Sequence, residues 1–530
     1  MQGVEKQAGF CAVSTVAPGL VDEKSVFGFL AAHRGEVFPA SSLDDLFADR
    51  SRAGHPSIPG PVLMSALVLQ ALTGVSDRGA AEALTYDLRW KAACGVAVDE
   101  TSWDPSVFCY FRARIAKSDR PGRVFQAVDA IIAATGVLKT RGRRVVDSTV
   151  LDDSVARQDT FKLLVWQIAR IGELMPGLDE GIMGLPGGVW YRDRAKPDID
   201  WRSARARDEL VSVLVNDAAT VAGWAEERIA ALPAGDPARE GLADQVGLLG
   251  VLAGQDVEPA PGSDGTDGRW RIARRTAPDR VISVVDPQAR HIRKTTQNKH
   301  DGFKAHMIAE PETGLVTAVA VSSGAGEGSS DAANAKTMLE TEPGVVAGQV
   351  TQLVGDSAYD TIDLLNTLDE RDLEPVVKPR PLPAPTPGGY SLDDFLVDGG
   401  QVICPAGHAA AKTAKQRASF ARWCHTCPLK DKCTTSKRGR VVVIGDTQLR
   451  LREHRRQARD PVFAATLRHH RPMAERTLAW LCRPGRRTPY RGTTKTSAWW
   501  TLRAAATNLK RLVSLGLEAT PAGWQLALTT

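Results

Sequence analysis

The first quarter of the chain has apolar residues at helical spacing. Residues 61–73 begin with Pro and then present a broad apolar face, which predicts a helix. Ser76 is a typical helix N-cap and Asp77 suits the positive end of a helix dipole, so a second helix is expected to begin there. Phe108, Phe111 and Ile115 recur at three- and four-residue spacing and predict a third helix over 101–115. A small DNA-docking helical bundle is one interpretation of this region, and a purely structural helical cap is the other.

The period then changes to that of β-strands. Arg144–Val150 is a β-branched run interrupted by one acid, Asp147. Further strands are predicted at 281–286, 302–310, 315–322 and 350–354, and the middle pair reads as a hairpin around a turn at 311–314. Helices are predicted over 160–255, 459–480 and 496–517, and loops at 259–267 and 379–388. A sheet interrupted by helices is an α/β layer, in which residues 160–255 form an insertion.

Composition narrows the class of protein. The chain has 530 residues, of which 43% are hydrophobic and 24% are charged, as is usual for a globular protein. No run of about 18 uncharged apolar residues occurs, so no membrane span is expected. The first residues include Glu5 and Lys6 and lack a basic-then-apolar signal peptide, which favours a cytoplasmic protein. Eight cysteines are too few for a disulfide scaffold.

The formal net charge of +5 hides a strong polarity along the chain. Residues 404–517 contain 25 Lys or Arg and 5 Asp or Glu, a local net charge of +20. The remainder carries 42 basic and 57 acidic residues, a net charge of −15. This asymmetry predicts an acidic body with a basic end that meets nucleic acid. The alternative, that Arg is the solvating residue of a GC-rich genome, does not account for its confinement to one region.

Three carboxylates stand where chemistry is expected. Asp147 interrupts an apolar strand, where an unpaired carboxylate is costly to bury. Asp356 follows the strand at 350–354, and ligands bind beyond the carboxyl ends of such strands. Glu475 lies in a predicted helix among cations. Together they suit two hard cations that clamp a phosphodiester. Each one alone is more typical of an ordinary cap, turn or salt-bridge acid, and it is the combination of three that favours a metal site. Asp152–Asp153 is a competing first ligand, placed less well because it follows the strand.

Several motifs resemble those of one enzyme family, the DDE transposases of bacterial insertion sequences, in the branch with an N-terminal helical transposase domain and an Arg-x-x-x-Glu third motif. The three acidic motifs correspond to Asp147-Ser-Thr149, Gly355-Asp356-Ser-Ala-Tyr359-Asp360 and Arg471-x-x-x-Glu475. Similarity extends to Gly302-Phe-Lys304-Ala-His306 on the second strand, Ser76-Asp77-Arg78 and Phe111-Arg112 in the N-terminal helices, and Asn508-Leu-Lys510-Arg511 in the last helix. The resemblance covers roughly 60–525.

The resemblance implies an α/β fold with a ribonuclease-H-like catalytic core. Its implied domains are an N-terminal helical DNA-binding domain over 1–135, a catalytic domain over 136–520 with a helical insert at 155–275 and a Cys-rich insert at 400–445, and a tail over 521–530. It also implies Mg²⁺ (or Mn²⁺) as cofactor. Asp147 and Asp356 would bridge the metal ions, and Glu475 would hold the second one.

The implied reaction is hydrolysis at the element's ends, followed by attack of the freed 3′-hydroxyl on target DNA. The partners are therefore terminal inverted repeats and target DNA, with a homo-dimer expected on DNA. The implied DNA-binding residues are Lys304, His306, Arg468, Arg471, Arg476 and Arg112. For Lys304 and His306, two polar residues on a solvated strand face are an equal alternative.

Two positions depart from the family pattern. The usual Tyr three residues before the motif's Arg is Arg468, and the usual Lys seven residues after its Glu is Cys482. These departures motivate an alternative function, a catalytically inactive zinc-containing DNA-binding regulator derived from a transposase. A metal-dependent nuclease without strand transfer is a third hypothesis.

Half of the cysteines fall within 30 residues. Cys404, Cys424, Cys427 and Cys433 provide four thiolates around a Cys-x-x-Cys knuckle, which is enough for a closed structural Zn²⁺ site. His408 and His425 are alternative ligands, and scattered free thiols are the alternative without metal. A thioredoxin-like redox site is disfavoured because no βαβ unit precedes the knuckle.

Overall fold

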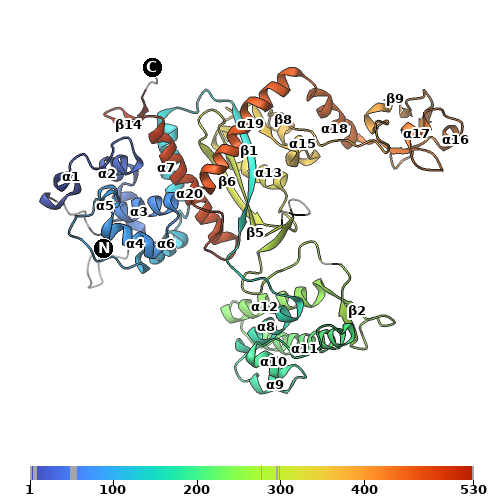
Figure 1. The fold of residues 1–530 in the computed structure, drawn as a ribbon, viewed down its shortest axis with the longest axis horizontal. Coiled ribbons are helices and arrows are strands. Elements are labelled where there is room, and N and C mark those ends of the chain that lie inside the picture. Colours follow the sequence, from blue (N-terminus) through green and yellow to red (C-terminus); the bar gives the residue numbers. More distant parts are fainter. Residues whose placement is uncertain are drawn as a thin grey trace.

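The computed structural model describes Gly3 and residues 9–47, 57–275, 277–293, 297 and 299–527. Figure 1 shows an elongated molecule with a β-sheet near its centre. The N-terminal helices lie at one end, the segment that carries the cysteine cluster lies at the other end, and a group of helices projects to one side. Each of these regions contains a hydrophobic cluster of buried side chains.

The central sheet is mixed. Its six strands are β1 (Arg143–Asp152), β4 (Arg290–Arg293), β5 (Lys299–Ala309), β6 (Val316–Ser323), β7 (Gln352–Gly355) and β8 (Glu374–Val377). β5 pairs antiparallel with β1 on one side, and with β4 and β6 in succession on the other. β1, β7 and β8 are parallel to one another. A mixed sheet covered by helices is compatible with the predicted ribonuclease-H-like core. The strand predictions for β1, the β5–β6 hairpin and β7 are confirmed.

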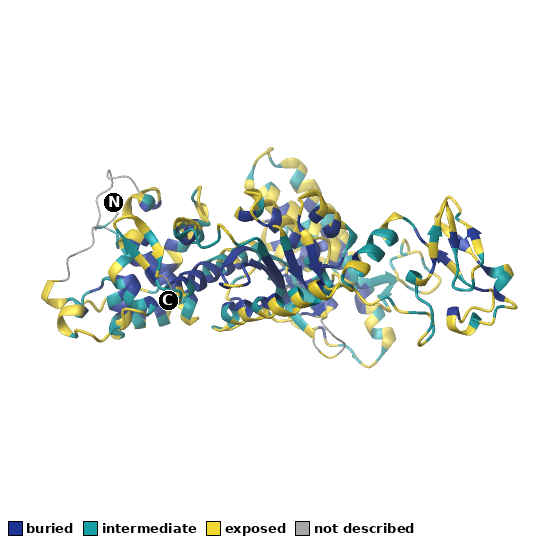
Figure 2. Ribbon diagram, turned by 90° about the horizontal axis from the view of Figure 1, so that it is seen from above, coloured by how far each residue is buried: buried dark blue, intermediate teal, exposed yellow. Residues whose placement is uncertain are grey.

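Helices cover both faces of this sheet. On one face, α19 (Pro461–Cys482) and α20 (Thr493–Ser514) pack on Val145 and Leu151 of β1. On the other face, α13 (Asp331–Thr341) and α15 (Ile362–Glu370) pack on Val146. In the sequence, the shorter elements α14 (Pro343–Val346) and η3 (Ser357–Tyr359) lie between α13 and α15. Because successive side chains of a strand point to opposite faces, an almost continuous apolar run is what a strand buried on both faces requires. Figure 2 shows much of the central sheet as buried.

The N-terminal region is helical. Its elements are η1 (Gly9–Cys11), α1 (Val13–Val16), α2 (Val26–Val37), η2 (Ala40–Leu46), α3 (Gly60–Thr73), α4 (Asp77–Tyr86), α5 (Leu88–Cys94), α6 (Ser106–Lys117) and α7 (Arg123–Thr135). The helices predicted at 61–73, from Asp77 and at 101–115 are confirmed, and Ser76 caps α4 by accepting a hydrogen bond from the Gly79 N–H at 3.1 Å. Among the described residues, no single helix is long and apolar enough to cross a membrane, although α3 and α4, bent by 112°, meet the length and composition criteria as a pair.

The core of the N-terminal helices is completed from the other end of the chain. Leu509 and Leu512 of α20 are fully buried in the same cluster as Leu67 of α3 and Phe108 of α6. The hairpin of β14 (Leu517–Thr520) and β15 (Gly523–Leu526) packs against the same cluster. α20 thus contacts both the sheet and the N-terminal helices, which makes it the structural link between them.

The helical insert has its own core. It contains α8 (Thr160–Glu173), α9 (Asp179–Gly184), α10 (Gly188–Asp193), α11 (Ala204–Ala231), α12 (Pro237–Gln255), and the small hairpin of β2 (Val257–Pro259) and β3 (Trp270–Ile272). The helices predicted over 160–255 are confirmed, and the predicted loop at 259–267 connects β2 to β3. The buried residues of this insert form one cluster.

The predicted strand at 281–286 is wrong. Only an isolated bridge joins Val281 to Arg290. Two glutamine side chains satisfy this backbone instead of a neighbouring strand: the Val281 N–H donates to Gln255 Oε1 at 2.8 Å, and the Val284 N–H donates to Gln158 Oε1 at 2.9 Å. An apolar run predicts burial, but its regular pairing depends on a partner strand that is not visible locally.

The cysteine-bearing segment consists of short elements. They are η4 (Leu392–Asp394), β9 (Leu396–Asp398), β10 (Gln401–Ile403), β11 (Ala409–Ala411), β12 (Arg417–Ser419), α16 (Ala421–Cys424), α17 (Lys430–Cys433) and β13 (Val441–Val443). Its small core is built around Phe395, Phe420 and two of the cysteines. α18 (Asp446–Gln457) then leads back to α19, whose predicted position is confirmed, as is that of α20.

Truncation of Leu509 should destabilise both ends of the chain, because this side chain lies in the core that α20 completes. We expect Leu509→Ala to lower the free energy of unfolding by about 2–5 kcal/mol. Lys510→Ala on the exposed side of the same helix should change it by less than about 0.5 kcal/mol. Urea denaturation measures both values, and hydrogen exchange in α3 shows whether the N-terminal helices loosen. Equal effects of the two substitutions would contradict this account of the core.

Candidate active site and cysteine cluster

Asp147 and Asp356 come together through the pairing of two parallel strands. In the register of β1 and β7, Val145 lies opposite Val354. Asp147 and Asp356 each lie two residues further along, so they occupy matching positions on the same face. On the other face of the sheet, a Cβ at Gly355 would lie 3.2 Å from side-chain atoms of both Val146 and Tyr359, so glycine relieves a tight contact there. The sheet therefore places two predicted catalytic acids side by side.

Helix α19 supplies a cation that lies between these two acids. Arg471 Nη1 is 2.9 Å from Asp147 Oδ2, and Arg471 Nη2 is 3.5 Å from Asp356 Oδ2. Glu475 lies one helical turn further along α19 and is exposed. Burial acts against the charge of Arg471, but the carboxylates of Asp147, Asp356 and Glu475 together raise the pKa of its guanidinium. Two of the predicted acids thus contact one arginine, and the third lies one turn along the same helix.

Asp147 is buried in the protein, which disfavours the charged form of its carboxyl group. Its residue surface is 7% exposed, and this burial raises the pKa of the carboxyl group above its ordinary value. Arg471 opposes the shift, as does the Ser148 N–H, which donates to Asp147 Oδ1 at 2.8 Å, while the charge of Asp356 adds to it. A buried carboxylate beside a second one is a site for positive charge.

Asp356 differs from Asp147 in exposure. Its side chain is 42% exposed, and it caps η3 by accepting a hydrogen bond from the Ala358 N–H at 2.8 Å. Tyr359, in the same motif, is fully buried beneath the two acids. Burial, together with the charges of Asp331, Asp147 and Asp356, raises the pKa of Tyr359 well above its ordinary value. Tyr359 belongs to the site that the sequence motif indicated, although no role was predicted for it.

The structure does not favour His306 as a DNA contact, which corrects the sequence prediction. Its side chain is fully buried, with Nε2 3.0 Å from Ser322 Oγ and Nδ1 3.7 Å from Asp331 Oδ1. Burial lowers the pKa of His306 to about 4, so the ring is neutral at pH 7. Lys304 on the same strand is 21% exposed, and its Nζ lies 3.5 Å from Asp331 Oδ1. Helix α13 covers this strand face, which the local alternation of polar residues could not indicate.

Arg112, another predicted DNA contact, is engaged within the protein. Its Nη2 donates to Asp77 Oδ2 at 2.5 Å, its Nη1 donates to Gln70, and its guanidinium lies 6.0 Å from the centre of the Tyr490 ring. These contacts tie α6 to α4 and to the segment after α19. Arg468 and Arg476, by contrast, are exposed on α19.

The competing acids Asp152 and Asp153 do not join the site around Arg471. They lie at the far end of β1, where Asp152 Oδ1 is 2.8 Å from His300 Nδ1. Asp153 is 8% exposed, and its Oδ2 has no hydrogen-bond partner among the described residues. Burial raises the pKa of Asp153 to about 6, with further contributions from Asp301 and Asp286.

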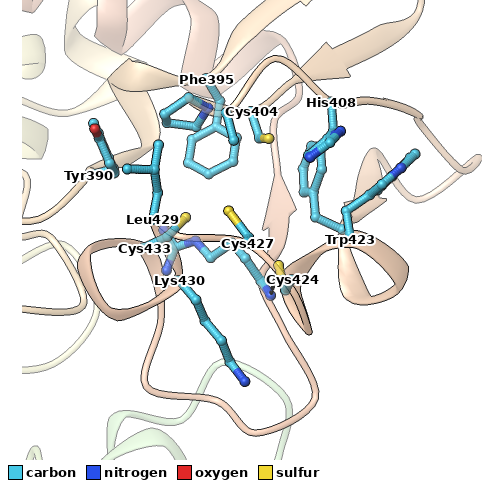
Figure 3. Close-up of a pocket in the computed structure, with 14 residues that line it drawn as sticks. Tyr390, Phe395, Cys404, His408, Trp423, Cys424, Cys427, Leu429, Lys430 and Cys433 are labelled. Atoms are coloured by element: carbon cyan, nitrogen blue, oxygen red, sulfur yellow. Dashed lines mark hydrogen bonds between the residues drawn. The ribbon is translucent and has the colours of Figure 1, made fainter.

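The four cysteines of the Cys-rich insert meet at one cavity. Cys404, Cys424, Cys427 and Cys433 all line a space of about 20 Å³, which Figure 3 shows between their sulfur atoms. Burial raises the pKa of the Cys433 thiol, and the charges of the other three cysteines raise it further, against the influence of Arg440. The Arg440 N–H donates to Cys424 Sγ at 3.4 Å. Such a cavity has room for about one water-sized particle.

In this conformation, neither cluster has the arrangement of a completed metal centre. Within the described residues, no group of three or more His, Cys, Asp or Glu side chains is positioned to hold a metal ion. At the first cluster, the Arg471 guanidinium lies between two of the carboxylates. At the second, the donors are four thiols around a small cavity, and four thiolates are the usual donor set of structural zinc.

Comparison with known proteins gives two matches. A family model described as "Transposase DDE domain" matches residues 403–513, which include the cysteine cluster and Glu475 but neither Asp147 nor Asp356. A model described as "Transposase domain (DUF772)" matches residues 25–114, from α2 to α6. Neither the search of curated proteins nor that of solved structures returned a match.

Asp153→Asn should make the protein more stable at neutral pH. The folded state raises the pKa of Asp153 to about 6 from an ordinary value of 3.8. The protonated carboxyl group therefore contributes its full stabilisation of the folded state only below about pH 3.8, and this contribution is lost as the pH rises through 6. The substitution removes this loss, so the variant should gain about 1–3 kcal/mol relative to the wild type between pH 4 and 7. Urea denaturation at several pH values measures the difference. Asp244→Asn on the exposed face of α12 is the control and should give parallel curves.

Proposed function

The two matched family models support a DDE transposase of the insertion-sequence type, and on this basis we propose that the chain cleaves DNA at the ends of an element and joins the freed 3′-hydroxyl groups to target DNA. The observation that carries the proposal is the contact of Arg471 with both Asp147 and Asp356, one helical turn from Glu475. Asp356 follows the carboxyl end of β7, which is where open α/β sheets bind ligands, and Arg471 links it to Asp147 in the middle of β1.

A DDE transposase domain implies the use of divalent metal ions in general. We propose that Asp147, Asp356 and Glu475 hold Mg²⁺ or Mn²⁺, because clustered carboxylate oxygens are the donors that these hard cations prefer. Bound there, two such ions stabilise the attacking and the leaving oxygen of a phosphodiester. The elevated pKa of Asp147 fits this assignment, because a nearby cation offsets the cost of burying its charge.

In this proposal, Arg471 has two states. Without metal, it pairs with both Asp147 and Asp356 and keeps the two carboxylates from repelling each other. With metal ions held by these acids, the guanidinium of Arg471 would no longer be needed to neutralise them and would be free for another partner. Arginine can then bind a phosphate through two parallel N–H donors. Arg468 and Arg476, exposed one turn before Arg471 and next to Glu475, are suited to the adjacent DNA backbone.

The remaining assignments extend the same proposal. The N-terminal helices dock DNA, for which exposed Arg78, Arg114 and Lys117 are better candidates than the paired Arg112. Because two ends must be brought together, a homo-dimer forms on DNA. Cys404, Cys424, Cys427 and Cys433 hold a structural Zn²⁺, since all four thiols line one cavity.

Removal of any of the three acids should abolish the chemistry without loss of DNA binding. We expect Asp147→Asn, Asp356→Asn and Glu475→Gln each to lower Mg²⁺-dependent cleavage at least about 100-fold, because each removes a metal-binding charge. The substrate is a plasmid that carries the DNA flanking this gene on both sides, and gel shifts measure binding. Glu453→Gln, at a partly exposed acid of α18 that pairs with Arg456, is the control.

The same assay separates the alternatives. Joined products exclude a nuclease without strand transfer. Wild-type protein that binds the DNA but neither cuts nor joins it would support the inactive regulator, an alternative to which Arg468 and Cys482 point. Undiminished cutting by Asp356→Asn would overturn the assignment of the site.

The zinc assignment has a separate test. Purified protein should contain about one zinc ion per chain by mass spectrometry, and Cys427→Ser should lose it, because a closed site needs all four ligands. Cys109→Ser, at an exposed cysteine of α6, should retain the metal. If wild-type protein that was expressed in zinc-supplemented medium contains no zinc after purification, the assignment is excluded.

A further inference from the structure

The Cys-rich insert carries a groove on its outer surface. The groove has a volume of about 810 Å³ and runs along β11, β12 and the start of β13. Lys415, Arg417 and Arg422 contribute to its lining and are exposed. Lys415 and Arg417 flank Gln416, whose φ of 57° shapes the tight turn before β12. The groove is distinct from the cavity between the cysteines.

The charges of this insert are not neutralised within the protein. Residues 404–444 contain nine Lys or Arg and one acidic residue, Asp431. None of these cations pairs with a carboxylate among the described residues, which include the whole of this segment. α18 shows the opposite behaviour: Arg450 pairs with Asp369 at 2.8 Å, and Arg455 pairs with Asp393 at 2.7 Å. Unpaired positive charge therefore remains available on the insert.

An aromatic side chain orients one of the groove cations. The Arg422 guanidinium carbon lies 3.8 Å from the centre of the Trp423 ring, and the His408 ring stacks on Trp423 with a centroid distance of 5.4 Å and an interplanar angle of 7°. A stacked guanidinium keeps its N–H donors free at its edges, so it can still bind a phosphate. Because Trp423 is already stacked within the protein, it is less suited to stacking on an extruded base.

We propose that this groove binds the phosphate backbone of duplex DNA through Lys415, Arg417 and Arg422. The proposal rests on the proposed function, which makes DNA the polyanion that this chain meets. Contacts to phosphates carry no sequence information, so the groove binds without sequence preference. Its position at the end of the molecule opposite the N-terminal helices (Figure 1) places this contact away from the site on β1 and β7. The groove holds DNA beside the reacting segment and does not take part in the chemistry.

The test compares two triple variants of the full chain with equal loss of charge. One is Lys415→Ala/Arg417→Ala/Arg422→Ala in the groove, and the other is Arg202→Ala/Arg207→Ala/Arg228→Ala on exposed positions of the helical insert. Fluorescence anisotropy measures binding of a random-sequence 40-base-pair duplex at several salt concentrations without Mg²⁺. Each phosphate contact contributes about 0.9 to the slope of log K against log salt, so the groove variant should lose about 2–3 from that slope and the control less than about 0.5.

Two further measurements keep the result interpretable. Zinc content and circular dichroism establish that the groove variant is folded, and Arg422→Lys, which keeps the charge, should keep the slope. A folded groove variant with the slope of the wild type, or equal losses in both triple variants, overturns the proposal. The binding assay does not depend on cleavage, so the two proposals can fail separately. If only the proposed catalytic function fails, the wild type cuts no DNA in the plasmid assay, but the groove variant still loses affinity in the binding assay.

Discussion

The parallel pairing of β1 with β7 is the constraint on which the site depends. It pairs Val145 with Val354 and so brings Asp147 and Asp356, each two residues further along, near each other, where two neighbouring carboxylates repel. The positive charge of Arg471 offsets that repulsion, and helix α19 must pack on β1 for the guanidinium to reach both acids. One strand register therefore fixes the position of α19, and with it that of Glu475.

The chain distributes its positive charge between two uses. Some arginines complete internal contacts, as Arg112 does with Asp77 and as α18 does with Asp369 and Asp393. Others, such as Arg468 and Arg476 on α19 and Arg417 in the insert, remain exposed. A net charge calculated from the sequence does not distinguish these groups, because ion pairing depends on which acids the fold brings near. The exposed group is the one relevant to a polyanionic partner.

The ends of the chain are mechanically joined. α20 buries Leu509 among the N-terminal helices and Trp500 in the core beneath the sheet. Movement of the N-terminal helices must therefore disturb the packing of a helix that also packs on the sheet beneath α19. In the proposed function, this shared helix is a direct physical connection between the proposed DNA-docking region and the site around Arg471.

The sequence by itself determined the elements whose signals are local: the capped helix at Ser76, the β5–β6 hairpin, and the acids placed at a strand interruption and a strand end. It also placed four cysteines within reach of one another. Only the tertiary structure decided that His306 is buried by α13, that Arg112 is paired, and that 281–286 bonds to glutamine side chains instead of a strand. The physical reason is that burial and pairing depend on neighbours distant in sequence, whereas caps, turns and strand alternation are set by residues a few positions apart.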